Sequence, residues 1–182
     1  MKSKLSVLAS AIVSVFVMST VLIAPANSVI DLQADINRIV AAINKFDANS
    51  AAATSVNSVA QIRVITRNNK AILGEIKDAN DYFKRDLISA KKLLPSRDTK
   101  DSPAYNTIFN LTRGYDQWLI YQNRNQVTGE RCLATSGNSY SEYTECLMMN
   151  LSKTFENERL GRIKLEAAWR AWKNWQVKYG YA

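Results

Sequence analysis

The chain contains no histidine and two cysteines, Cys132 and Cys146. The lack of imidazole excludes haem ligation by histidine, most zinc sites and every nucleophile–base pair built on histidine. The two cysteines do not form a Cys-x-x-Cys pair, which would supply a thiolate of low pKa for redox chemistry. In an oxidising compartment they predict one structural disulfide, which would close a loop of about fifteen residues and add roughly 3 kcal/mol of stability.

Carboxylates are therefore the side chains left for acid–base or metal chemistry. Three pairs of carboxylates lie within one helical turn of each other: Asp78 and Asp81, Glu142 and Glu145, and Glu156 and Glu158. A helical di-metal site would need Glu-x-x-His, and the Asp-x-Asp-x-Asp-Gly pattern of a calcium loop is missing. We therefore expect solvated helix faces at all three pairs, no cofactor, no metal site and no catalytic residues. An enzyme that uses carboxylates alone is the least favoured alternative.

Aromatic rings and positive charge come together near the C-terminus. Residues 159–182 hold six basic residues and one acidic residue, a net charge of +5. Removal of a leader peptide over residues 1–26 would take Lys2 and Lys4 with it. Residues 27–182 then have 22 basic and 16 acidic residues, a net charge of +6. We predict a contact surface at this end of the chain, formed by Trp169, Arg170, Trp172, Lys173, Trp175, Lys178 and Tyr179.

Two interpretations of this C-terminal region are open. With about 100° per residue, the rings share one side of a helix and the basic residues occupy most of the rest, which is typical of helices in a membrane interface. The arrangement also suits an anionic membrane surface, a wall polymer or a protein partner. Alternatively, the rings pack into the protein core and the basic residues form a solvated face. Nucleic acid is not expected, because the chain is predicted to be exported and carries no recognition motif.

The N-terminus predicts a signal peptide over residues 1–26. Lysines at positions 2 and 4 precede an uncharged stretch over residues 5–23, and Ala-Pro-Ala at 24–26 supplies small residues for cleavage. The alternative is an uncleaved anchor, since the stretch approaches the ~20 residues that a membrane-spanning helix needs. In either case the basic start places residues 27–182 outside the cytoplasm. We therefore expect a secreted, periplasmic or cell-surface protein, anchored to the membrane if the signal is not cleaved.

Residues 27–182 are predicted to form a single all-α domain, because apolar residues recur at helical spacing and no segment alternates long enough to form a strand. Four helices are expected: about sixteen residues from Asp31, about Ser55 to Leu94, Ser102 to about Val127, and Ser141 to Tyr181. Thr128-Gly129 is expected to end the third helix, and the loop from Glu130 to Tyr140 to be held by the disulfide. Ser139 or Ser141 is expected to cap the last helix.

Four amphipathic helices with short connections predict an antiparallel bundle, in which each apolar stripe is buried against the others. Two of the helices are long and two are short, so either a long helix bends or the last fifteen or so residues extend beyond the bundle. We expect an exported binding or interaction protein of the cell envelope or extracellular space, with the basic, tryptophan-rich end as its contact surface. The alternative is an inhibitor or accessory subunit of another exported protein, docking through a groove between helices.

Overall fold

The computed structural model describes residues 32–93 and 103–179, with side chains described over 34–89 and 106–174. These ranges form five helices and no strand: α1 (Leu32–Ala52), α2 (Val59–Leu93), α3 (Pro103–Thr135), α4 (Tyr140–Met149) and α5 (Leu151–Tyr179). The prediction of an all-α fold is thus confirmed. The predicted signal peptide and its cleavage site lie outside the described residues. None of the described helices has the length and apolarity needed to cross a membrane.

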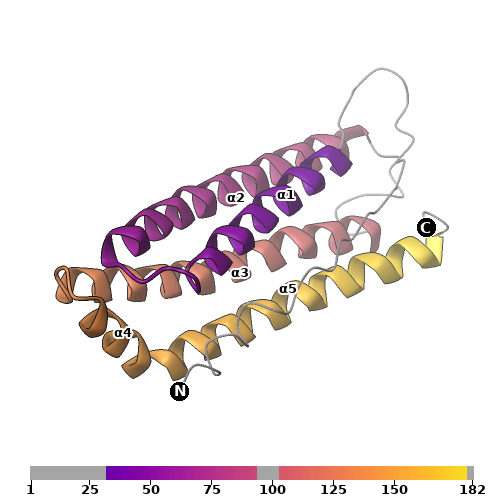
Figure 1. The fold of residues 1–182 in the computed structure, drawn as a ribbon. Coiled ribbons are helices and arrows are strands. Elements are labelled where there is room, and N and C mark those ends of the chain that lie inside the picture. Colours follow the sequence, from indigo (N-terminus) through magenta and orange to yellow (C-terminus); the bar gives the residue numbers. More distant parts are fainter. Residues whose placement is uncertain (1–31, 94–102, 180–182) are drawn as a thin grey trace.

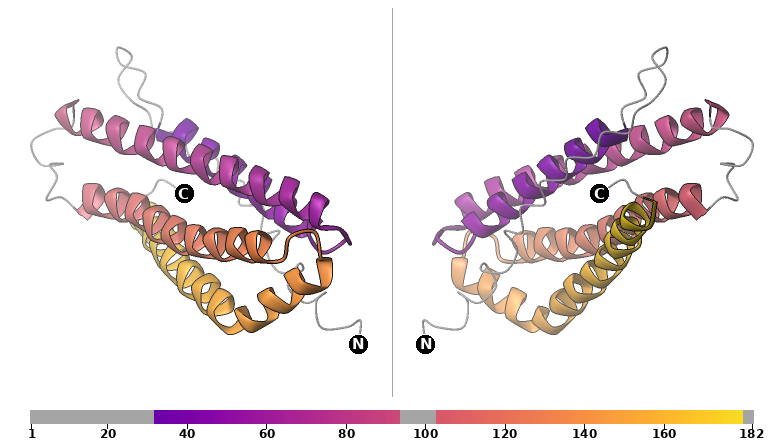
Figure 2. Two further views of the ribbon diagram at one scale, coloured as in Figure 1. Left: turned by 90° about the vertical axis from the view of Figure 1, so that its left-hand side faces the viewer. Right: turned by 90° about the vertical axis from the view of Figure 1, so that its right-hand side faces the viewer.

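The long helices pack mainly in chain order. α1 and α2 form a hairpin, α3 lies along α2, and α5 returns along α3 (Figure 1). The short helix α4 joins α3 to α5 at an angle, so that these three helices outline a triangle (Figure 2). The most extensive contacts are those of α3 with α5, of α1 with α2 and of α2 with α3. The helices therefore form a series, in which α3 has large contacts with both its neighbours.

The first helix is longer than the sequence predicted, because α1 continues through Asp47 to Ala52. Polar contacts between helices support this extension. Asn49 Nδ2 donates to Asn69 Oδ1 at 2.7 Å and to the Ile65 carbonyl at 3.0 Å, while Asn69 Nδ2 donates to Ser50 Oγ at 3.0 Å. Side chains that favour turns in an isolated segment are thus held in a helix by bonds to α2.

The expectation that Thr128-Gly129 ends the third helix is wrong. α3 continues to Thr135, and the Thr128 hydroxyl donates to the carbonyl of Arg124 within the helix at 3.0 Å. The helix ends instead before Gly137, whose φ of +56° is a left-handed conformation that glycine adopts without steric cost. The loop therefore shrinks to residues 136–139, and most of the predicted loop is helical.

The predicted long last helix is also wrong, because it is two helices that meet at Asn150. Asn150 Nδ2 donates to the Cys146 carbonyl at 2.9 Å, a local bond that competes with the regular helix ladder. The predicted cap is confirmed at Ser139, whose hydroxyl accepts from the backbone N–H of Glu142 at 3.2 Å. The split removes the length mismatch, since α2, α3 and α5 have 35, 33 and 29 residues.

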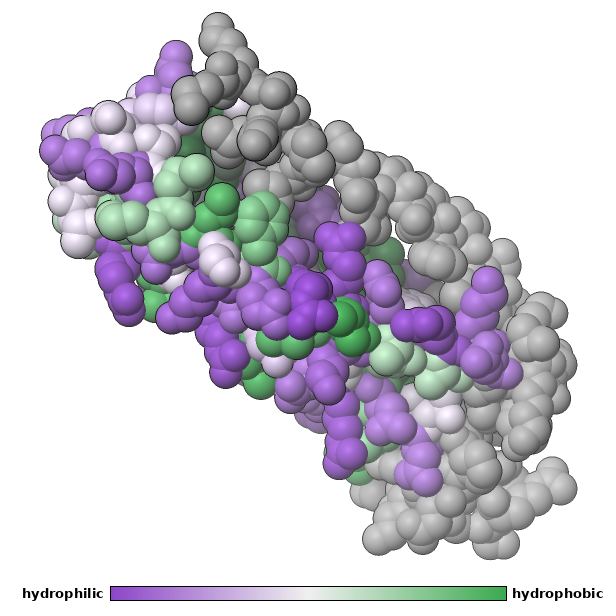
Figure 3. Space-filling model, turned by 90° about the horizontal axis from the view of Figure 1, so that it is seen from below, coloured by the Kyte–Doolittle hydropathy of each residue, from purple (hydrophilic) through white to green (hydrophobic). Residues whose placement is uncertain are grey.

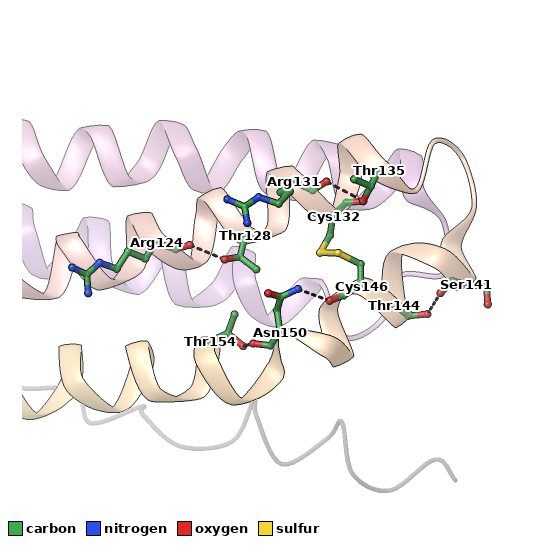
Figure 4. Close-up of a disulfide and its surroundings, with 10 residues drawn as sticks. All are labelled: Arg124, Thr128, Arg131, Cys132, Thr135, Ser141, Thr144, Cys146, Asn150 and Thr154. Atoms are coloured by element: carbon green, nitrogen blue, oxygen red, sulfur yellow. Dashed lines mark hydrogen bonds between the residues drawn. A yellow bond between two sulfur atoms is a disulfide. The ribbon is translucent and has the colours of Figure 1, made fainter.

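The apolar interior consists of two clusters. The larger cluster is built from all four long helices and includes Ile39, Ile76, Phe83, Leu111, Tyr115 and Trp172. The smaller cluster lies at the α4 end and contains Val59, Ile62, Cys132, Leu133 and Tyr143. The predicted disulfide between Cys132 and Cys146 is confirmed, and it ties α4 to α3 beside this smaller cluster (Figure 4).

Candidate contact surface

The two described tryptophans of α5 face the interior. Trp172 is 2% exposed and belongs to the larger apolar cluster, and Trp169 packs against that cluster. The Trp169 ring also meets the ring of Tyr115 edge to face, with the centroids 6.1 Å apart. The interpretation in which the rings belong to the core therefore describes Trp169 and Trp172.

The basic residues of the predicted surface have a different environment from the rings. Arg170 and Lys173 are exposed, whereas Trp172 beside them is buried. The remaining predicted members, Trp175, Lys178 and Tyr179, lie outside the described side chains. The structure thus separates the predicted surface into an inward aromatic side and an outward cationic side.

Two glycines set the close approach of α5 to α3. A Cβ atom on Gly114 would lie 2.6 Å from Cβ of Ala168, and one on Gly161 would lie 3.2 Å from Cβ of Tyr121. A side chain at Gly114 would push the helices apart, whereas one at Gly161 would require Tyr121 to shift by a few tenths of an ångström. This close approach holds the α5 backbone against α3. The side of α5 that carries Trp169 and Trp172 then faces the interior.

The described lysines of α1 and α2 have carboxylate partners. Lys45 binds Glu75 at 2.8 Å, Lys70 binds Glu130 at 3.0 Å, Lys77 binds Asp81 at 2.8 Å, and Lys84 binds Asp116 at 2.7 Å. Hydrogen bonds from Gln126 and Lys70 lower the pKa of Glu130, so this carboxylate stays charged at neutral pH. These lysines are thus balanced locally, whereas Arg63, Arg67 and Arg85 of α2 are exposed and have no carboxylate at ion-pair distance among the described residues.

Four cations along α5 lack such partners. They are Lys153, Lys164, Arg170 and Lys173, and all four are exposed. Among the described residues, no carboxylate lies within ion-pair distance of any of them, whereas their neighbour Arg159 binds Glu156 at 2.7 Å. An exposed ammonium or guanidinium without a protein partner can bind a carboxylate or phosphate from another molecule. We refer to these four residues as the α5 cationic face.

A small polar cluster lies where α1, α3 and α5 come together. Gln122 Nε2 donates to Glu158 Oε2 at 2.6 Å, and Arg162 lies 3.7 Å from Glu158 Oε1. Burial, and then the negative charge of Glu158, raise the pKa of Asp47 to about 6, while Arg162 opposes this shift. Asp47 nevertheless keeps exposed surface. The cluster holds one carboxyl that titrates near neutrality.

The paired carboxylates found in the sequence have different surroundings. Glu156 binds Arg159 on the surface, whereas Glu158 turns toward Gln122. A surface depression on α2 is lined by Asp78, Asp81, Tyr82, Lys84 and Arg85. A hydrogen bond from Lys77 lowers the pKa of Asp81, so this carboxylate is held in its charged form.

The described part of the chain contains no group of three histidine, cysteine or acidic side chains that could hold a metal ion. Its α5 cationic face is a set of hydrogen-bond donors in solvent, of the kind that can bind anions. No protein-family model, curated protein or solved structure matches this chain.

Proposed function

We propose that the protein is an exported helical binding protein of the cell envelope or extracellular space, which contacts an anionic partner through the α5 cationic face. The supporting observation is the difference in pairing: the lysines of α1 and α2 described above bind carboxylates, whereas Lys153, Lys164, Arg170 and Lys173 have none. Like charges without partners repel one another, and an anionic partner would relieve that repulsion.

Binding through this face relies on charge and hydrogen bonding. Trp169 and Trp172 are occupied in the interior, so they serve to fix α5 in place rather than to enter a lipid layer. A surface of this kind attracts anionic head groups or a charged wall polymer, and its affinity falls as salt screens the charges. The partner is therefore expected to carry repeated negative charges.

Export is supported by two independent features. The basic and apolar pattern of residues 1–26 has the order of a secretory signal. The disulfide between Cys132 and Cys146 is of the kind that persists in oxidising compartments. Sequencing the N-terminus of the protein recovered from cells tests this part directly: a start near position 27 supports cleavage, and an intact Met1 supports the uncleaved anchor.

Co-sedimentation tests the contact surface. The purified protein, with its N-terminus sequenced, is mixed with anionic vesicles, neutral vesicles and an insoluble anionic wall polymer. The variant Lys164→Gln/Arg170→Gln/Lys173→Gln is expected to bind at least about tenfold more weakly than the wild type to whichever anionic material is bound.

The matched control for this experiment is Lys45→Gln/Lys70→Gln/Lys77→Gln. It removes the same charge from lysines that are exposed but have carboxylate partners. This control is expected to bind within about twofold of the wild type, because its charges lie away from the α5 cationic face. Equal losses in both variants, or no binding of the wild type to any anionic material, would contradict the proposal.

A second function is favoured by the surface near the junction of α4 and α5. Met148 is 59% exposed, Met149 75% and Phe155 43%, and hydrophobic residues reach the surface at this end of the molecule (Figure 3). Exposed apolar side chains that gather together are typical of protein contact sites, and methionine adapts to varied partners. The protein would then be an inhibitor or accessory subunit of another exported protein. Affinity capture of a stoichiometric partner that Met148→Asp/Met149→Asp loses would support this function.

A further inference from the structure

Two helices carry cations at the same spacing. Arg113 and Arg124 on α3 are eleven residues apart, and Lys153 and Lys164 on α5 are also eleven residues apart. Eleven residues make about three helical turns, so each pair lies on one side of its helix with about 16 Å between its members. All four side chains are exposed.

The register of α3 against α5 brings these pairs together. A Cβ on Gly114 would lie 3.5 Å from the Lys164 carbonyl, and Asn125 Nδ2 donates to the Thr154 carbonyl at 3.2 Å. Because each cation is next in sequence to one of these contact residues or is one itself, Arg113 lies level with Lys164 and Arg124 level with Lys153. The α3–α5 contact therefore has two levels along its length, each with one arginine and one lysine. We refer to these two levels as cationic steps.

The four cations share the outer side of this contact. Trp118 on α3 and Trp172 on α5 lie in the larger apolar cluster, which marks the inner side of the contact. By helical geometry, Arg113 and Arg124 lie more than about 100° around α3 from Trp118, and Lys153 and Lys164 lie about 80–100° around α5 from Trp172, so both pairs lie beside the contact and away from the core. We refer to these four residues as the α3–α5 seam.

Both arginines are held by aromatic rings of their own helix. The guanidinium carbon of Arg113 lies 4.8 Å from the centroid of the Phe109 ring, and that of Arg124 lies 5.1 Å from the Tyr121 ring. Such stacking orients a guanidinium while leaving N–H groups at its edge free to donate. Arg124 and its neighbour Arg131 extend in the same direction along α3 (Figure 4).

Carboxylates are directed away from the seam. Asp116 of α3 is bound by Lys84, and Glu130 of α3 is bound by Lys70, both on the α2 side. Within the described residues, none of the four seam cations has a carboxylate at ion-pair distance. The seam thus combines two oriented guanidinium groups and two ammonium groups without local neutralisation.

We propose that the α3–α5 seam binds a linear, phosphate-bearing polymer that lies along the two helices and contacts both cationic steps. This inference rests on the proposed function and extends its contact surface from α5 onto α3. A row of cations along a helix contact matches an extended chain, whereas a planar membrane would meet the outermost side of α5. The planar guanidinium group of arginine can donate two parallel hydrogen bonds to phosphate oxygens. A polymer that reaches both cationic steps gains affinity that a single anion lacks.

Calorimetric titration of the purified protein tests the proposal, with long-chain inorganic polyphosphate and orthophosphate as probes. Polyphosphate is expected to bind at least about a hundredfold more tightly than orthophosphate, because only the chain reaches both steps. Its affinity is expected to fall linearly on a double-logarithmic plot against salt, since binding releases counterions from the chain. Equal affinity for the two probes would overturn the proposal.

The variant Arg113→Gln/Arg124→Gln isolates the contribution of α3. It is expected to bind polyphosphate about tenfold more weakly and to lower the slope of the salt dependence by about two. Lys45→Gln/Lys77→Gln is the matched control, with the same change of charge at paired lysines on α1 and α2, and it is expected to stay within about twofold. Thermal unfolding of both variants checks that they remain folded.

The outcomes separate this proposal from the proposed function. If Arg113→Gln/Arg124→Gln binds as the wild type does while the α5 triple variant fails, the seam is wrong and the α5 cationic face stands. If the wild type binds anionic vesicles but not polyphosphate, the membrane contact is right and the seam is wrong. An equal loss in the control variant means that net charge alone attracts the polymer, which also overturns the seam. Failure to bind any anionic probe overturns both.

Discussion

Exposed lysines on the α2 side and on the α5 side of the molecule differ in whether a carboxylate of the same chain binds them. On the α2 side, Lys45, Lys70 and Lys77 each bind a carboxylate of the same chain. On the α5 side, Lys153 and Lys164 are exposed without such a partner in the described residues. Net charge alone does not reveal this difference, because it counts paired and unpaired cations equally. The comparison shows that two surfaces with similar cations can differ in ion pairing, and this difference is the basis of the proposed contact surface.

The largest effect is expected from the inward side of α5. Trp172→Ala removes a side chain that is 2% exposed in the larger apolar cluster, so it leaves a cavity and is expected to cost about 3–5 kcal/mol of unfolding free energy. Lys173→Ala, at the neighbouring outward position, is expected to change it by less than about 0.5 kcal/mol. Urea unfolding of both variants measures the difference.

The two variants at the end of α5 also test the division of its surface. If the two substitutions lower the unfolding free energy by similar amounts, the ring of Trp172 is not in the core. The aromatic side of α5 is then again a candidate contact surface. If Trp172→Ala alone is destabilising, the aromatic side is structural, and only the outward cations are available for binding.

The sequence predicted the features of the fold that depend on local pattern. The all-α class, the second helix to within a few residues of its observed ends, the cap at Ser139 and the disulfide between Cys132 and Cys146 all follow from periodicity, composition and cysteine number. Each of these signals is contained in a short stretch of chain or in a count. They could therefore be found without knowledge of which helices touch.

The wrong helix ends depend on individual contacts, some between distant segments and some local, that composition does not describe. Asn49 is helical because it bonds to α2, and α3 passes through Gly129 because no steric or hydrogen-bonding feature of that position stops it. At Asn150 a side-chain bond to a backbone carbonyl accompanies the break between α4 and α5. Composition describes which residues occur in a stretch. Where a helix ends depends on which hydrogen-bond partners lie near each residue in the folded chain.

The candidate site was predicted in part for the same reason. The sequence pointed to the basic end of α5, but it could not show whether the rings or the cations face outward. The role proposed for Arg113 and Arg124 required the register of α3 against α5, which is given by contacts at Gly114 and Asn125. Their eleven-residue spacing, repeated at Lys153 and Lys164, was a signal present in the sequence.

A smaller effect is expected at Asp47, where the α1–α2 pair meets α5. Its pKa in the folded state is raised from 3.8 to about 6, so the folded state holds the proton more tightly than the unfolded state does. The stability that this carboxyl contributes is therefore present below about pH 4 and is lost as the pH rises through 6. Asp47→Asn is expected to match the wild type at pH 4 and to be more stable at pH 7, by no more than about 1 kcal/mol because water screens the exposed part of the group.

Urea unfolding at several pH values between 4 and 7.5 measures this change. Glu156→Gln serves as a control of opposite sign, because Arg159 lowers the pKa of Glu156 and the charged form is favoured in the fold. It is expected to be less stable than the wild type at pH 7 and equal to it at low pH. A gain for Asp47→Asn that is the same at pH 4 and pH 7 would mean that Glu158 and burial do not act on this carboxyl.

The smallest effect addresses the comparison of the two sides most directly. Lys70→Gln removes a paired cation and leaves Glu130 with fewer donors, so it is expected to cost up to about 0.5 kcal/mol. Lys164→Gln removes an exposed cation from a side that is already rich in positive charge. It is expected to leave the unfolding free energy unchanged or to raise it slightly, because it reduces repulsion between like charges. High salt is expected to make the unfolding free energies of the two variants more similar, since screening weakens both the ion pair and the repulsion. If Lys164→Gln is instead as destabilising as Lys70→Gln at low salt, Lys164 has a partner within the chain, and the α5 cationic face is a structural network rather than a surface open to an anionic partner.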